Sequence, residues 1–169
     1  MHRLIKNPGC FWLFPFIFCL CALAPIEASR AQFVIIAPAN SCIDSLSMRQ
    51  LQKLFKGQPL KTCLEMPVQI VEYAPVSDAF YKKLYGLGVY AIGKHWLRLI
   101  FSGERVLPPK SFSEPRKLLK FLHEHENAIG FLPEDVYRKN RQNAIKDVVI
   151  EGRSHTDSLY VLKAKLKKK

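Results

Sequence analysis

The sequence predicts a single α/β domain in which helices flank a mixed sheet, and three observations support this prediction. Short β-branched apolar runs of strand length alternate with stretches whose apolar residues recur at helical spacing. The segment 77–132 holds three successive helical patterns and ends in an apolar strand, so we expect the other elements to be arranged around it. The chain has 169 residues, and the part that follows an expected leader of 31 residues suffices for one domain with a real core but not for two.

The first 31 residues have the layout of a secretory signal peptide. Arg3 and Lys6 form a basic start, the run 11–26 is apolar, and small residues in 29–31 lie where a signal peptidase would cleave. Gln32 would then be the first mature residue. An uncleaved membrane anchor is the alternative, but the apolar run is shorter than the roughly 20 residues that span a bilayer. We therefore expect a periplasmic protein.

After the leader we expect one domain at 32–162 and a basic tail at 163–169. The net charge of +12 suggests acidic partners, which include phosphate-like anions, anionic lipid or lipopolysaccharide, and nucleic acid. An exported protein seldom meets nucleic acid, so no nucleic-acid partner is predicted. The lysines of the tail are expected to be frayed and solvated.

Two of the five cysteines, Cys42 and Cys63, lie outside the leader. An even pair of cysteines in an exported protein predicts a disulfide between them. Two unpaired buried thiols are the alternative, and the spacing alone does not decide between the two.

The first half of the domain is expected to contain two strands and a helix. The run 32–37 reads as a buried strand that Pro38 ends. Ser47 is the expected N-cap of a helix that Gly57 stops, and the alternating run 67–73 is the second strand.

The second half is expected to be mainly helical up to its last strands. Ser77 is the expected N-cap of a helix that ends near Gly86, and a fourth helix begins at Ser111 or Ser113. Between them, the third helix carries one apolar stripe, which consists of Val89, Ile92, Trp96, Leu99 and Ile100. Further strands are expected at 128–132, 147–151 and 159–162.

Four motifs occur in the order found in type II periplasmic binding proteins of the phosphate importer class. They are Ser45-Leu46-Ser47 with the LFKG run 54–57, Phe80-Tyr81, the WLRLIFSG run 96–103 with Pro108-Pro109, and the AIGF run 128–131. The chain most resembles the short, single-domain phosphate ABC transporter substrate-binding protein-like branch, from Phe33 to Leu132. The resemblance implies one lobe of a type II periplasmic binding protein-like fold.

The resemblance also implies a ligand, which is a small anion and, in the best-known family members, phosphate. Backbone N–H groups and hydroxyls at helix N-termini hold such an anion. The matching position here is the turn 73–78, where binding members carry an arginine and a Ser-Gly-Thr run. This chain lacks those residues, so only Ser77 carries over, and Asp78 would repel an anion unless it accepts a hydrogen bond.

Three further residues are candidates for binding the anion. Asn40 and Ser41 follow the first strand, and Arg105 lies in a loop that resembles a family turn. Full binding proteins of this class are much longer and close two lobes on the ligand. One lobe can present an open anion site but cannot enclose one.

Neither a metal site nor catalysis is predicted. His123 and Glu126 are only two potential ligands, and His95 has no catalytic partner in sight. No Gly-x-Ser-x-Gly run or Ser-His-Asp order appears. We expect a protein that is not an enzyme and needs no cofactor.

Three functions remain open. The first is an anion-binding module that resembles a substrate-binding protein. The second is a signalling or interaction module that has lost its ligand and docks on a periplasmic sensor or membrane transporter. The third is a basic envelope protein that binds anionic lipid or lipopolysaccharide. The sequence does not fix the oligomeric state.

Overall fold

The main sheet of the protein is mixed, as the sequence predicted. The computed structural model describes residues 30–60 and 66–165. The strand order is β4-β3-β5-β1-β6, and β8 also pairs with β1. The strands are β1 (Arg30–Pro38), β3 (Gln69–Tyr73), β4 (Lys110–Phe112), β5 (Ala128–Pro133), β6 (Ile145–Asp147) and β8 (Lys163–Lys165). A separate parallel pair joins β2 (Ser45–Leu46) to β7 (Val149–Ile150).

The strand directions define two ends of this sheet. Strands β3, β4 and β5 run parallel to one another, whereas β1 runs antiparallel to β5. The carboxyl ends of the three parallel strands therefore lie together with the start of β1, and we call this end the carboxyl edge. The opposite end, where β1 finishes and β3 and β5 begin, is the amino edge.

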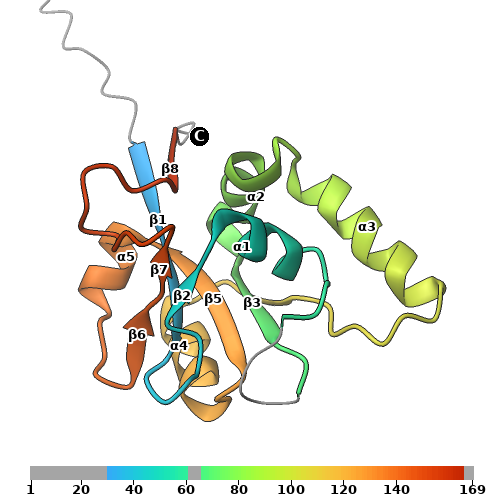
Figure 1. Ribbon diagram of the computed structural model, residues 1–169, viewed down its shortest axis with the longest axis horizontal. Coiled ribbons are helices and arrows are strands. Elements are labelled where there is room, and N and C mark those ends of the chain that lie inside the picture. Colours follow the sequence, from blue (N-terminus) through green and yellow to red (C-terminus); the bar gives the residue numbers. More distant parts are fainter. Residues whose placement is uncertain (1–29, 61–65, 166–169) are drawn as a thin grey trace, which may run out of the picture.

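Helices cover both faces of the sheet (Figure 1). Helices α1 (Met48–Leu54), α2 (Ser77–Tyr85) and α3 (Val89–Phe101) pack on one face. Helices α4 (Pro115–Glu124) and α5 (Glu134–Lys139) pack on the other. Helix α3 lies farthest from β1, at the outer side of the molecule. In the described part of the chain, no helix is both long and apolar enough to span a membrane.

Strand β1 is the centre of the core because both of its faces are buried. Phe33 and Ile35 point to the layer of α1, α2 and α3, and Val34 and Ile36 point to the layer of α4 and α5. All four side chains are fully buried. This explains why the strand reads as a continuous apolar run rather than an alternating one.

The start of α1 confirms the predicted N-cap. The backbone N–H of Gln50 donates to Ser47 Oγ at 3.2 Å, and the Gln50 side chain accepts from the Ser47 N–H at 2.8 Å. The two bonds form a reciprocal capping box. Gly57, the predicted stop, adopts a positive φ of 79° after the helix.

The predicted cap of α2 is wrong. A 3-10 turn at Ala74–Val76 leads directly into α2, so Ser77 is the first helical residue and Val76 occupies the cap position. The physical reason is Pro75, whose fixed φ suits the first turn of a helix and starts the helical path before the serine.

The predicted start of the fourth helix is also wrong. Helix α4 begins at Pro115 with Glu114 as its N-cap. Ser111 lies instead in β4, where it pairs with Glu72 of β3. Ser111 is therefore part of the strand pairing and does not cap a helix, and α4 begins at Pro115, whose fixed φ suits a first helical turn.

The last strands differ from the prediction as well. The expected strand 147–151 splits into β6 and β7 around Val148. The expected strand 159–162 is absent from the described chain, and β8 begins at Lys163 instead. Tyr160 and Leu162 are nevertheless buried, which is why this run looked like a strand. The first residues of the expected basic tail therefore belong to the sheet.

Candidate functional site

The carboxyl edge is the place where helix starts gather. Helix α2 follows β3, α4 follows β4, and α5 follows β5 directly. In open α/β sheets, ligands bind outside the carboxyl ends of the strands. The start of β1 and its partner β8 lie at the same edge, because Phe33 pairs with Pro133 and Gln32 pairs with Lys163. This edge is therefore the first place to look for a ligand site.

Ser77 lies at this edge in the first turn of α2. Its side chain is buried, and its hydroxyl donates to the backbone carbonyl of Ala74 at 3.0 Å. The hydroxyl closes the 3-10 turn and could donate to an anion only after leaving Ala74. The backbone N–H of Ser77 also donates to the Ala74 carbonyl, and Pro75 has no N–H, so the N–H of Val76 is the remaining backbone donor of this turn.

Asp78 does not face the start of its own helix. Its carboxylate forms an ion pair with Lys82 at 2.6 Å and accepts from the backbone N–H of Val89 at 3.1 Å. These two bonds, first the one from Lys82, lower the pKa of Asp78. The carboxylate is thus neutralised by a lysine and capped onto α3, which reduces the repulsion that the sequence suggested.

Asn40 and Ser41 lie at the amino edge, far from Ser77. The Asn40 side chain donates to Glu126 Oε1 at 2.6 Å, next to the start of β5, and Ser41 Oγ accepts from Ile43 N–H at 3.2 Å. The strand register separates the levels of Asn40 and Tyr73 by about six residues, or roughly 20 Å. The structure therefore does not bring Asn40 and Ser41 together with Ser77.

Arg105 is also remote from Ser77. It is exposed in the turn after α3 and lines a cavity together with Met66 and Pro67, which precede β3 at the amino edge. Of the four candidate ligand residues, only Ser77 lies at the carboxyl edge. The anion-binding role of each of the four stays a prediction.

The disulfide stays a prediction too. Cys42 lies in the exposed loop after β1, but Cys63 falls within 61–65, outside the described residues. Across 30–60 and 66–165, no group of three or more His, Cys, Asp or Glu residues is arranged to hold a metal ion.

Sequence reasoning missed a buried carboxyl on β3. Glu72 is 9% exposed, and its carboxylate accepts a hydrogen bond from the Tyr81 hydroxyl of α2. Burial raises the pKa of Glu72, although the bond from Tyr81 works in the opposite direction. The missed signal was the strand alternation, since Ile70 and Glu72 occupy the same face of β3 and Ile70 is in the core.

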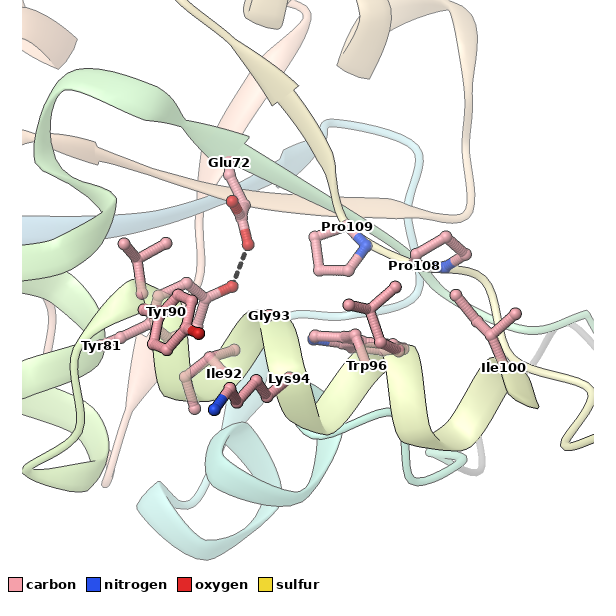
Figure 2. A pocket seen from close by; sticks show the side chains of 12 residues that line it. Glu72, Tyr81, Tyr90, Ile92, Gly93, Lys94, Trp96, Ile100, Pro108 and Pro109 are labelled. Atoms are coloured by element: carbon pink, nitrogen blue, oxygen red, sulfur yellow. Dashed lines mark hydrogen bonds between the residues drawn. The ribbon is translucent and has the colours of Figure 1, made fainter. Parts of the chain in front are cut away.

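Glu72 lies at a cavity of about 390 Å³ between α3 and the segment before β4 (Figure 2). Trp96 and Tyr90 of α3 line it, and Pro108 and Pro109 form its other side. Trp96 is 5% exposed, and its Nε1 has no hydrogen-bond partner within the described residues. We call this cavity the α3 groove, and the α3 residues that line it include Tyr90, Gly93, Lys94, Trp96 and Leu97.

Comparison with solved structures identifies the fold. An ABC-type phosphate transport receptor from Vibrio cholerae matches with a TM-score of 0.55 and 14% identity, over 80% of this chain and 54% of that chain. PstS from Borrelia burgdorferi matches with a TM-score of 0.55 and 8% identity, over 80% and 55%. No family model matches the sequence, and neither does any curated protein sequence.

The chain therefore has the fold of the substrate-binding proteins of phosphate transport. It spans about half the length of these structures. This confirms the predicted type II periplasmic binding protein-like fold.

Proposed function

We propose that this protein is an exported binding module, not an enzyme, which holds a small phosphate-like anion in an open site at the carboxyl edge. The observation that carries the proposal is the start of α2 at this edge, in a fold that the chain shares with phosphate transport receptors. The helix dipole and the backbone N–H groups of a first turn favour an anion.

The charges around the edge support the same proposal. Lys82 pairs with Asp78, so this carboxylate does not oppose an anion with a full charge. Strand β8, made of Lys163, Ala164 and Lys165, packs against α2. The net charge of the whole chain is +12, and most of this positive excess lies outside the expected leader, so it would also attract anions from solution.

The affinity is expected to be modest. An anion at the surface of this edge keeps part of its contact with water, and water weakens every charge–charge interaction. Ser77 must also exchange its bond to Ala74 for a bond to the ligand. A module of this kind would present or sense an anion rather than trap it, in line with a periplasmic location and a transporter or sensor as partner.

Calorimetric titration of phosphate at low salt, with sulfate as the comparison anion, tests the proposal. We expect saturable heat that Ser77→Ala weakens. Asn40→Ala is the matched control, because Asn40 was an equal candidate by sequence but lies at the amino edge. Phosphate binding that Asn40→Ala abolishes and Ser77→Ala leaves intact would refute the assignment of the site.

A second candidate function is an interaction module that docks on another envelope protein. The observation that favours it is the apolar outer surface of α3, where Tyr90 is 74% and Phe101 is 85% exposed. Exposed apolar surface of this extent on a folded domain indicates an interaction site.

A further inference from the structure

Helix α3 is apolar on two sides. Its inner side contributes Ile92 and Trp96 to the core. Its outer side carries a second stripe, whose residues are Tyr90 (74% exposed), Leu97 (54%), Ile100 (43%) and Phe101 (85%). A surface helix normally keeps one apolar stripe and a polar opposite face, and a helix that is apolar on both sides is usually covered on both. The outer stripe of α3 therefore lacks a cover within the described chain.

The stripe borders a hollow that could receive a side chain. Gly93 lies between the levels of Tyr90 and Leu97 and lines the α3 groove. A Cβ atom at Gly93 would meet no atom within 4 Å, so the space above it is open. Deeper in the groove, Trp96 Nε1 has no partner among residues 30–60 and 66–165, and the Glu72 carboxylate accepts a hydrogen bond from Tyr81. A ridge beside a hollow can interlock with the side chains of a bound polypeptide, which a flat surface cannot do as well.

The charges around the groove are mainly positive. Lys94 lines the groove and Arg98 follows it one turn later on α3, and both are exposed. Arg105 is exposed in the turn after α3, whereas the Lys110 ammonium lies over the Phe121 ring of α4, on the other side of the sheet. Glu104 is an exposed carboxylate in the turn after α3, whereas Asp78 of α2, next to the start of α3, is paired with Lys82. An apolar stripe within a cationic rim is complementary to apolar side chains flanked by carboxylates.

We propose that the α3 groove binds a segment of another protein that presents apolar anchor side chains flanked by Asp and Glu. One anchor would enter the hollow over Gly93, and the flanking carboxylates would face Lys94 and Arg98. A second copy of this chain is a poorer occupant because it would bring the same cations, Lys94 and Arg98, to the contact. The proposal deepens the second candidate function and uses none of the residues of the anion site, so the two can fail separately.

Selection of peptides from a displayed random library against the purified protein provides the test. We expect the enriched sequences to combine two or more apolar residues with Asp or Glu. A synthetic peptide of the consensus should bind, and its copy with Lys in place of every acidic residue should not. Binding should weaken as salt rises, since the rim charges are exposed.

Three variants locate the binding. Leu97→Ser removes an exposed anchor contact, and Gly93→Leu adds a side chain beside the hollow at a position where a Cβ meets no neighbour within 4 Å. Each should raise the Kd of the peptide roughly tenfold or more. Leu159→Ser is the matched control, since Leu159 is 65% exposed but lies outside α3. It should leave the Kd unchanged.

Several results would overturn the proposal. They are failure to enrich any peptide, enrichment of basic peptides, and a Kd that Leu97→Ser and Gly93→Leu leave unchanged. Self-association in sedimentation experiments that Leu97→Ser abolishes would assign the surface to a second copy. Binding of vesicles of phosphatidylglycerol, in place of peptide and lost in Leu97→Ser, would assign it to lipid.

Discussion

Asp78, on the first turn of α2, accepts a hydrogen bond from the backbone N–H of Val89 at the start of α3, at 3.1 Å. The N-cap of α3 is Gly88, which has no side chain to cap the helix. Asp78 supplies the missing cap from the preceding helix and also meets Lys82 at 2.6 Å. A Cβ at Gly88 would lie 2.8 Å from Asp78 Oδ1, so the glycine is what lets the carboxylate approach.

Asp78→Ala should destabilise the protein by about 1 kcal/mol, the typical cost of losing an N-cap. Urea unfolding followed by circular dichroism measures this. Asp78→Asn is the control, because its amide oxygen can still accept from Val89 and should retain most of the stability. A loss as large for Asp78→Asn as for Asp78→Ala would show that the ion pair with Lys82, not the cap, matters.

The same carboxyl predicts a loss of stability in acid. Its pKa is lower in the folded protein than its ordinary value of 3.8. Its contribution to stability is therefore present above pH 3.8 and is lost as pH falls through the folded pKa. The difference in melting temperature between wild type and Asp78→Ala should accordingly shrink below pH 3.8.

Glu72 predicts the opposite pH dependence. Burial raises the pKa of its carboxyl above the ordinary value of 4.5. The folded state then holds the proton more tightly, so this contribution to stability is full below pH 4.5 and is lost as pH rises through the folded pKa. Glu72→Gln, which can still accept from Tyr81, should remove this loss and raise the melting temperature at pH 7.5 but not at pH 4.

Tyr81→Phe is the counterpart of that substitution. It leaves the Glu72 carboxylate buried without its hydrogen bond, and we expect a cost of about 1–3 kcal/mol at neutral pH. In the Glu72→Gln background the cost should be smaller, because no charge is left uncompensated. Equal costs in both backgrounds, measured by chemical unfolding, would contradict a role of the charge.

Two glycines predict opposite results for the same substitution. A Cβ at Gly130 of β5 would lie 3.0 Å from the backbone carbonyl oxygen of Val71 on β3, so Gly130→Ala must push the two strands apart. We expect destabilisation of about 1–3 kcal/mol. Gly93→Ala meets open space inside α3 and should stabilise the protein by about 0.5–1 kcal/mol. Thermal unfolding of the two variants measures both changes, and we expect a lower melting temperature for Gly130→Ala and a higher one for Gly93→Ala.

The sequence predicts the elements well where local chemistry determines them. Ser47 with Gln50 forms the capping box, and the run around Ile35 becomes the buried centre of the sheet. The sequence prediction fails where a residue pairs with a partner that is distant in the chain but adjacent in space. Ser111 is drawn into the ladder beside Glu72, and this pairing of residues far apart in the chain leaves no mark in the local pattern.

The candidate site is predicted less well than the fold. Asn40 and Ser77 both follow strands, and the sequence does not say that β1 runs antiparallel to β5, which in turn runs parallel to β3. That relative direction sends the two loops to opposite ends of the sheet. The α3 groove depends on which side of a doubly apolar helix faces solvent, and this is decided only by packing.

The most direct test of the central claim is an NMR titration of the isotope-labelled protein with inorganic phosphate at low salt, which follows each backbone amide. We predict saturable shifts concentrated in 74–80, at the start of α2, with the amides around Asn40 unmoved. Shifts centred on Asn40 and Ser41, or no saturable shift from a folded sample, would contradict an anion site at the carboxyl edge.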